Sequence, residues 1–265
     1  MSWCILVNTT PKYMQYAEVQ IACIRRYAPK LDEIPIFIAT EVRPSRGSAL
    51  DNILKEVNTH YIMLQPEEAG FLESRLAGIG YLPDLYDFVL PLQEDFWLDR
   101  APDYVKLDEA LTILREDRNV KSIRLMPSPG PHDDDNVYSG SWKLLSKNDI
   151  YRFTFQATLW RISLYKKFLE RILMVASKDF NDSGLPPTDW AKYCIRANVA
   201  ENLKGQAIFS EFMTASSLHL SIERQHKNKN AVYLAPWPYR PTAVVQGSLE
   251  PWAKEFAMRE GFSLE

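Results

Sequence analysis

The chain has 265 residues, a formal net charge of −3 and a hydrophobic fraction of 46%, the balance of an ordinary globular protein with enough chain for a sizeable core. No apolar run approaches the roughly 20 residues that a membrane-spanning helix needs, and the acidic balance offers no basic surface to a nucleic-acid backbone. We therefore expect no transmembrane segment and no nucleic-acid partner.

The first half of the chain alternates short apolar runs with helical patterns. The apolar runs predict strands at residues 3–7, 34–40, 61–64, 88–92 and 120–125. Helical periodicity predicts helices between them, at residues 13–27, 48–57, 67–78 and 108–117. Strands that alternate with helices of about 10–15 residues indicate parallel pairing through βαβ units. The first half is therefore predicted to be a parallel-rich, Rossmann-like α/β sheet.

The second half has a mixed pattern that begins with a Pro- and Gly-rich loop at residues 127–135. We predict strands at residues 151–157, 207–210, 218–222, 231–234 and 243–246, a loop at 181–187, and helices at 164–176, 188–203 and 250–260. No linker rich in Gly or Ser interrupts the chain. We expect one α/β domain over residues 1–265, parallel-rich up to residue 125 and mixed from 126 onward.

The cysteines point to a reducing compartment. Cys4, Cys23 and Cys194 lack the close spacing of a metal site and are interpreted as small buried hydrophobes. The apolar run at residues 3–7 is short and is followed at once by polar residues, so we interpret it as a strand and not as a secretory signal. A cytoplasmic location is the resulting expectation.

The glycines exclude several phosphate-binding motifs. The chain has 10 glycines, scattered so that no GxGxxG, GxxxxGK[ST] or GxSxG pattern can be assembled. Each of these motifs needs glycine where the backbone approaches a phosphate or turns sharply. A phosphate ligand would have to be held by side chains or by a cation.

Polar residues follow the first, second and fourth predicted strands, where ligands bind in open α/β sheets. These residues are Asn8-Thr9-Thr10, Thr40-Glu41 and Gln93-Glu94-Asp95. Adjacent carboxylates between apolar stretches are costly to desolvate without a positive partner. A divalent cation is one such partner, and solvation or pairing with Arg100 is the alternative.

Two segments resemble those of GT-A fold glycosyltransferases. Residues 92–98, LQEDFWL, resemble the acidic metal motif of small enzymes from bacterial surface-glycan clusters and large DNA viruses. In those enzymes an aromatic strand bearing Gln and Trp follows, here residues 151–161 with Gln156 and Trp160. The resemblance spans about residues 3 to 205. The usual motif has Asp at both ends, whereas this chain has Gln93 at the first position, which leaves Asp95 as the expected metal ligand.

The resemblance implies a GT-A-like fold and a metal-dependent transfer of a hexose from a nucleotide diphosphate sugar, expected to be a UDP-sugar. Residues 1–125 would bind the donor, and residues 126–265 would bind a glycan or glycoprotein acceptor. A Mn²⁺ or Mg²⁺ ion between Asp95 and the diphosphate would neutralise charge, above all as the nucleotide leaves. Glu94 and Gln93 would lie beside the bound donor.

Further side chains have a predicted binding role and a structural alternative. Asn8, Thr9 and Thr10 are placed to receive the nucleobase and ribose, or to form a helix cap and turn. Arg75 is a candidate phosphate ligand, or a surface arginine paired with Glu68 or Glu73.

The aromatic strand carries two more candidates. Gln156 would bind sugar hydroxyl groups, or would bridge backbone groups in the core. Trp160, like Trp190, would stack on a pyranose face, or would be a core tryptophan.

The carboxy-terminal half adds a base and two histidines. The resemblance implies that Asp189 acts as the catalytic base at a helix start, where the helix dipole alone also favours an acid. His219 and His226 are further metal candidates. Asp133, Asp134 and Asp135 form the stronger acidic string, but no predicted strand fixes them, and a solvated loop is the preferred interpretation over an acceptor-side or lid role.

Two other classes of protein remain open. A non-catalytic carbohydrate or nucleotide-sugar binding module would bind the donor without metal-dependent turnover. A glycoside hydrolase would need two carboxyl groups about 5–10 Å apart and no nucleotide affinity.

Overall fold

The computed structural model of the chain describes residues 2–127, 136–146, 152–183, 217–223, 235–239, 243–245 and 247–264. The strands of this part of the chain are β1 (Ser2–Asn8), β2 (Ile36–Thr40), β3 (Thr59–Met63), β4 (Tyr86–Gln93), β5 (Val120–Arg124), β6 (Val137–Ser139), β7 (Trp142–Leu144), β8 (Thr158–Arg161), β9 (Leu218–Ile222), β10 (Val244–Val245) and β11 (Ser248–Leu249). The helices are α1 (Met14–Tyr27), α2 (Ala49–Ile53), α3 (Glu73–Gly80), α4 (Tyr104–Glu116), α5 (Ile162–Ser183) and α8 (Pro251–Arg259), with 3₁₀ turns η1 (Pro11–Tyr13), η2 (Pro29–Leu31) and η3 (Pro66–Glu68).

A nine-stranded sheet in the order β3-β2-β1-β4-β8-β5-β9-β7-β6 forms the centre of the described chain. Strands β3, β2, β1 and β4 are mutually parallel. Strand β8 lies antiparallel between β4 and β5, and β9 continues parallel to β5. The apolar runs of β1 and β2 are buried on both faces, as parallel strands covered by helices must be. The predicted α/β class, with a parallel-rich first half and a mixed second half, is confirmed.

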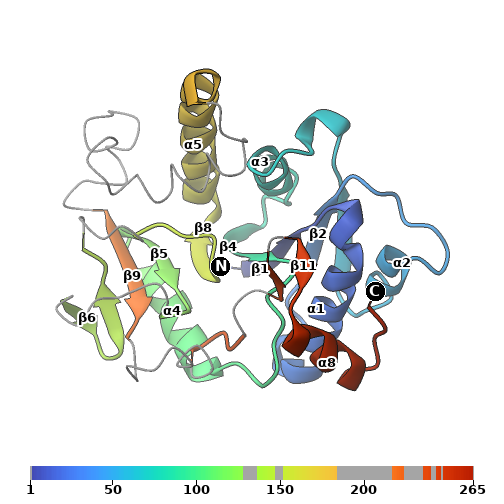
Figure 1. Ribbon diagram of the computed structural model, residues 1–265. Helices are drawn as coiled ribbons and strands as arrows, with labels where there is room; N and C mark the ends of the chain where they lie inside the picture. Colours follow the sequence, from blue (N-terminus) through green and yellow to red (C-terminus); the bar gives the residue numbers. More distant parts are fainter. Residues whose placement is uncertain are drawn as a thin grey trace.

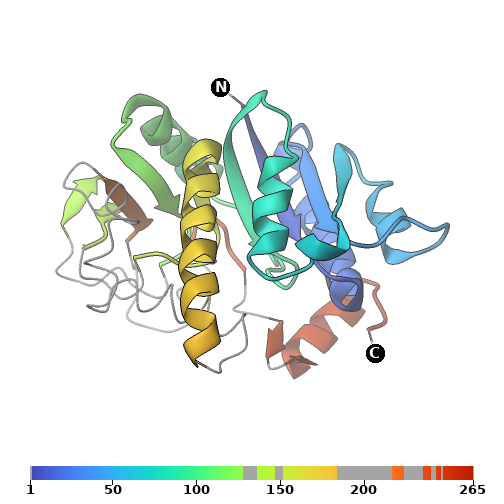
Figure 2. The ribbon, with the colours of Figure 1, turned by 90° about the horizontal axis from the view of Figure 1, so that it is seen from above.

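Helices cover the sheet on both faces and leave a core on each side (Figure 1). One core joins α1, α2, α4 and α8 to alternate strand residues such as Ile5 and Ile38. The other joins α3 and α5 to the opposite residues, such as Leu6 and Ala39. Figure 2 shows α3 and α5 side by side over the sheet. No helix in the described part of the chain is long and apolar enough to cross a bilayer.

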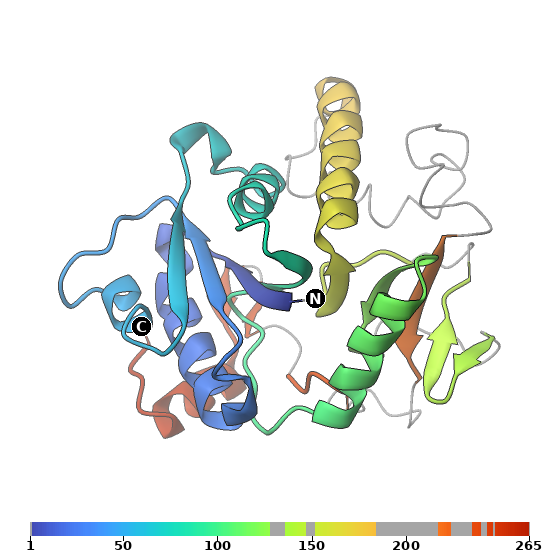
Figure 3. The same ribbon diagram turned by 180° about the vertical axis from the view of Figure 1, so that it is seen from behind.

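The carboxy-terminal helix is tied to the first helix. The carboxylate of Glu260, just after α8, accepts hydrogen bonds from Tyr27 at 2.8 Å and from Arg259 at 3.3 Å, and it pairs with Arg26. Phe256 of α8 stacks on Trp97, whose ring centroid lies 6.0 Å away. In Figure 3 the red α8 lies beside the blue α1. The last segment of the chain thus packs against the first half of the fold.

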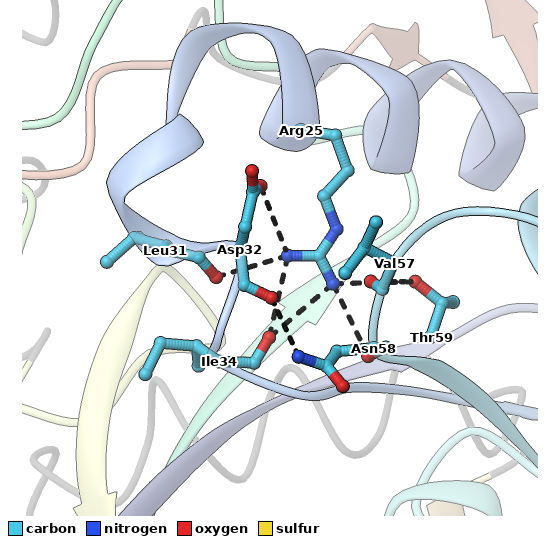
Figure 4. A network of polar contacts seen from close by, with 7 residues as sticks. All are labelled: Arg25, Leu31, Asp32, Ile34, Val57, Asn58 and Thr59. Atoms are coloured by element: carbon cyan, nitrogen blue, oxygen red, sulfur yellow. Dashed lines mark hydrogen bonds and ion pairs between the residues drawn. The ribbon is translucent and has the colours of Figure 1, made fainter.

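A buried arginine joins the loops at the amino ends of β2 and β3 (Figure 4). Arg25, near the end of α1, donates to the carbonyl of Leu31 at 3.1 Å and to that of Asn58 at 3.3 Å, and faces Asp32 at 3.9 Å. Asn58 has φ +48° and donates through its side chain to the Asp32 carbonyl at 2.9 Å. This network lies at the edge of the sheet opposite the strand ends that were predicted to bind ligands.

Several predicted elements have different bounds. The predicted helix at 67–78 is divided, since residues 66–68 form the 3₁₀ turn η3 and α3 begins only at Glu73. The aromatic run at 151–157 was predicted as a strand, but the strand starts at Thr158, after bends at 152–157. Helix α5 extends through Ser183, past the predicted end, since Gly184 is the first helix breaker. The hairpin β6–β7 was not predicted.

Some predictions fall outside the described residues. These are the helix at 188–203, the strands at 207–210 and 231–234, most of the loop at 127–135, and the residues Asp133, Asp134, Asp135, Asp189, Trp190, Cys194 and His226.

Candidate active site

A cleft of about 430 Å³ lies at the carboxyl ends of β1 and β4. Segments far apart in sequence meet in it: the turn after β1, the start of α3, the acidic residues after β4, and the β10–β11 hairpin. Its walls are formed by Asn8, Thr9, Thr10, Tyr13, Ala69, Phe71, Ser74, Arg75, Gln93, Glu94, Asp95, Val244 and Gly247. Seven of the residues predicted from sequence are therefore brought together: Asn8, Thr9, Thr10, Arg75, Gln93, Glu94 and Asp95.

The β1 side of the cleft is held by α3. Asn8, the last residue of β1, donates through Nδ2 to the Ser74 carbonyl at 2.9 Å. A Cβ at Gly78 would lie 3.1 Å from the Ala39 side chain and 3.3 Å from Asn8 Nδ2, so glycine lets α3 approach the strand ends this closely. This hydrogen bond fixes the side chain of Asn8, which lines the cleft.

The acidic segment is fixed from behind. Gln20 of α1 donates through Nε2 to the Gln93 carbonyl at 2.6 Å and to the Phe96 carbonyl at 3.4 Å. The indole of Trp97 donates to the Glu94 carbonyl at 2.9 Å. These bonds hold the turn that carries Glu94 and Asp95 in one conformation, as a ligand-binding pair requires.

The two carboxylates are close enough to perturb each other. Burial, and after it the charge of Asp95, raises the pKa of Glu94 to about 7, although its own backbone N–H and Arg75 act in the opposite direction. Asp95 is only 5% exposed, and its side chain accepts a hydrogen bond from the Val244 backbone N–H at 3.4 Å. The pair forms a negative site that a cation would stabilise.

Arg75 supplies a buried positive charge to the same cleft. It is 6% exposed, and its guanidinium lies 3.8 Å from the centroid of the Phe71 ring and 5.1 Å from that of Phe155. It donates to the Phe71 carbonyl at 2.7 Å. Burial lowers the pKa of Arg75, while the nearby Tyr165, Glu94 and Asp95 raise it, and a guanidinium stays protonated.

The alternative for Arg75, a surface arginine paired with an acid of its own helix, is wrong. Within the described part of the chain no ion pair involves Arg75. Glu68 instead accepts from the Tyr81 hydroxyl at 3.0 Å and from the Gln65 backbone N–H at 2.8 Å. Arg75 is instead a buried residue that lines the cleft.

Trp160 and His219 lie in the core and not in the cleft. The ring of Trp160 is 2% exposed and stacks on Phe168 at 5.1 Å. His219 is fully buried, shares a 2.8 Å hydrogen bond between Nδ1 and Ser122, and meets the ring of Phe153 edge-on at 4.7 Å. The prediction that Trp160 stacks on a sugar and that His219 binds the metal is corrected, because protein atoms surround both rings.

Gln156 remains a prediction. Its side chain is half-buried, and its Oε1 accepts a hydrogen bond from the hydroxyl of Tyr239. It does not line the cleft.

The cleft also contains residues that the sequence did not reveal. Tyr13 comes from the turn η1, Phe71 precedes α3, and Ser74 lies in the first turn of α3. Val244 and Gly247 belong to the β10–β11 hairpin, and Gly247 has φ +80°, a conformation that favours glycine. Gly247 follows the predicted strand at 243–246, but the sequence did not identify where the hairpin folds back.

No protein-family model and no curated protein matches the chain. Among solved structures, it aligns with 4-diphosphocytidyl-2C-methyl-D-erythritol synthase from Anaerococcus prevotii at a TM-score of 0.51 and 13% identity, covering 97% of this chain and 96% of that one. An active-site mutant of LgtC aligns at a TM-score of 0.48 and 13% identity over 97% and 95% of the two chains. S. aureus TarS 1–349 in complex with UDP-GlcNAc aligns at 0.44 and 14% identity, over 63% of this chain and 47% of that one.

Sequence identities of 13% and 14% support a shared fold and do not support a shared activity. The chain covers about half of the TarS segment but nearly all of the synthase. At the level of fold, the chain therefore shares the α/β architecture of the synthase.

Proposed function

We propose that the chain is a metal-dependent glycosyltransferase that moves a hexose from a nucleotide diphosphate sugar, a UDP-sugar, to a glycan or glycoprotein acceptor. The observation that carries this proposal is the cleft itself, which joins the polar end of β1, a buried arginine and a pair of carboxylates in one cavity. Each of these features suits a different part of a nucleotide-sugar.

The donor is assigned to the cleft by chemistry. Asn8, Thr9 and Thr10 offer carbonyl and hydroxyl groups to the base and ribose. Arg75, whose guanidinium lies 3.8 Å from the centroid of the Phe71 ring, offers a planar pair of donors, which suits phosphate oxygens. Because the chain has no glycine-rich phosphate loop, this arginine and a cation would carry the recognition of the diphosphate.

The two carboxylates of the acidic pair are suitable ligands for a divalent cation, but two protein ligands do not fill its coordination shell. Glu94 and Asp95 both line the cleft, and carboxylate oxygens are the preferred ligands of Mg²⁺ and Mn²⁺. The described residues contain no group of three or more His, Cys, Asp or Glu that could hold a metal by themselves. Such a cation would be shared between the protein and the donor phosphates, and when bound it would stabilise the negative charge of the leaving nucleotide.

The rest of the proposal concerns the sugar, the acceptor and the location. Gln156 is proposed to contact the transferred sugar, Asp189 to act as base, and residues 126–265 to receive the acceptor. A cytoplasmic location is supported by the buried free thiols of Cys4 and Cys23, whose pKa burial raises to about 12 and which are therefore unreactive.

The test is a titration of UDP in Mn²⁺ and then in EDTA. We expect UDP to bind in Mn²⁺ and to lose most of its affinity in EDTA. Equal affinity in both would contradict the metal-bridged donor.

A second measurement separates an enzyme from a binding module. Hydrolysis of a panel of UDP-hexoses is followed with Mn²⁺ and with EDTA. A glycosyltransferase hydrolyses its donor slowly and only with the metal, whereas a non-catalytic module binds the donor and leaves it intact.

A further inference from the structure

Tyr239 is a fully buried tyrosine that touches two parts of the proposed site. Its hydroxyl contacts the Oε1 of Gln156, lies 3.0 Å from the sulfur of Met126, and accepts a hydrogen bond from the Ala157 backbone N–H at 3.4 Å. Its ring stacks on Phe96, the residue after Asp95, with centroids 4.4 Å apart and planes inclined by 19°. One side chain thus connects the segment before β8 with the acidic turn after β4.

The hydrogen bonds of the Tyr239 hydroxyl determine which end of the Gln156 amide contacts this tyrosine. A tyrosine hydroxyl has one hydrogen to donate, and here it already accepts from Ala157. An amide oxygen is a stronger acceptor than a thioether, so the hydrogen goes to Gln156 rather than to Met126. Burial raises the pKa of Tyr239, as does the charge of Asp95 to a smaller extent, so the hydroxyl stays protonated and remains a donor.

The amide nitrogen of Gln156 is left for a ligand. Among the described residues it makes no hydrogen bond, and Gln156 is half-buried rather than enclosed. A half-buried amide nitrogen with two hydrogens suits a sugar hydroxyl oxygen or another neutral oxygen acceptor.

Tyr239 also belongs to a segment that is anchored on the acidic turn. Its backbone forms an antiparallel bridge with Leu98. Four residues on, Ala243 donates to the Asp95 carbonyl at 3.3 Å, and Val244 contacts the Asp95 side chain. Tyr239 therefore contacts Gln156, while Ala243 and Val244 contact Asp95.

We propose that Tyr239 is a positioning residue that orients the Gln156 amide so that its nitrogen serves as hydrogen-bond donor to the sugar of the bound donor. This inference rests on the proposed function. It adds Tyr239 as a positioning residue, and it states that Gln156 donates the hydrogen bond to the sugar. It predicts that Gln156 contacts an oxygen acceptor on the sugar, and that its own oxygen never reaches the ligand.

The key variant is Tyr239→Phe, which keeps the stack on Phe96 and removes the hydroxyl. We expect UDP affinity in Mn²⁺ to stay the same and donor turnover to fall about tenfold, the effect of one lost hydrogen bond. Gln156→Ala should lower turnover by a similar factor. The double variant should be no slower than Gln156→Ala alone, because the hydroxyl acts only through that amide.

Gln156→Glu tests whether residue 156 donates or accepts the hydrogen bond with the sugar. It retains an oxygen acceptor for Tyr239 and removes both N–H donors, so its turnover should fall as far as that of Gln156→Ala. Tyr27→Phe is the matched control, since it removes another tyrosine hydroxyl that binds a side chain, that of Glu260 at 2.8 Å, away from the cleft. This control should lower stability and leave turnover unchanged.

A measurement without turnover separates a failure of this inference from a failure of the proposed function. In ¹⁵N-labelled protein the side-chain amide of Gln156, assigned by its absence in Gln156→Ala, should be ordered in the wild type and mobile in Tyr239→Phe. Unchanged amide dynamics, normal turnover of Tyr239→Phe, or additive losses in the double variant would each overturn the role of Tyr239. A wild-type chain that binds no nucleotide, with the amide nevertheless ordered by Tyr239, would contradict the proposed function instead.

Discussion

At the scale of single residues, the cleft balances two buried carboxylates against one buried guanidinium. Glu94 and Asp95 repel each other, and this repulsion adds to burial in raising the pKa of Glu94. Arg75 lies in the same cleft but is held against Phe71 and by the Phe71 carbonyl. A diphosphate with a divalent cation would satisfy both charges, with the anion facing the arginine and the cation facing the acids.

Asp95→Asn tests the metal assignment, because asparagine keeps the shape of the side chain and removes its charge. We expect the fold to survive and the Mn²⁺-dependent part of UDP affinity to fall by about a factor of ten or more, equivalent to at least 1.4 kcal/mol. Replacing Asp133, Asp134 and Asp135 together by Asn should leave the Mn²⁺ response unchanged. A triple variant that loses the response while Asp95→Asn keeps it would show that the metal is bound elsewhere.

Arg75→Lys tests whether the planar group matters as well as the charge. A lysine keeps the charge but neither stacks on Phe71 in the same way nor offers two parallel donors. We expect calorimetry to show about tenfold weaker binding of UDP and unchanged binding of uridine, which has no phosphate. Equal losses for both ligands would mean that Arg75 supports the cleft wall and does not bind phosphate.

At the scale of elements, α8 is anchored to α1 by one buried carboxylate. Burial alone would raise the pKa of Glu260, but the hydrogen bonds from Tyr27, Arg259 and Arg26 outweigh it and lower the pKa below its ordinary value of 4.5. A lowered pKa in the folded state stabilises the protein above the unfolded-state value, and that stabilisation is lost as the pH falls through the folded-state value.

Glu260→Gln should therefore destabilise the protein most at neutral pH. We expect a loss of about 1–3 kcal/mol at pH 7, the usual range for hydrogen bonds to a charged group, and a smaller difference from the wild type below pH 4.5. Chemical denaturation at pH 7 and pH 4 measures both. Glu255→Gln, an exposed acid of the same helix, is the control and should change little at either pH; a pH-independent loss for Glu260→Gln would assign its role to packing.

At the scale of the whole molecule, the cleft depends on four segments that only the folded chain brings together. Strand β1 pairs with β4, which leads into the acidic turn. Helix α3 reaches the cleft from one face of the sheet, and the β10–β11 hairpin comes from the carboxy-terminal part of the chain. Ligand binding should therefore protect distant parts of the sequence at the same time.

Hydrogen exchange tests this arrangement. With UDP and Mn²⁺, we expect slower exchange in peptides that cover residues 8–13, 71–76, 93–97 and 243–249. Peptides that cover the Arg25 network, at residues 31–34 and 57–59, lie at the opposite edge of the sheet and should not change. Protection confined to one segment would contradict a shared cleft.

The sequence by itself determined the central strands and the polar residues that follow them. Apolar runs such as those of β1 and β4 are buried on both faces, so they could only be inner strands of a covered sheet, and parallel strands place their carboxyl ends at one edge. That reasoning alone brought Asn8 and Asp95 into one predicted site.

Only the tertiary structure decided which side chains face the cleft and which face the core. Trp160 and His219 stand on strands whose side chains alternate between two faces, and the core that encloses Trp160 combines α5 with residues of β1, β4 and α3 that are distant in the chain. The same holds for Arg75, since its place in the cleft depends on where α3 begins and on the approach of Phe155 from a distant segment. Local periodicity specifies strands and their ends, whereas the partner of each side chain depends on contacts between segments distant in the chain.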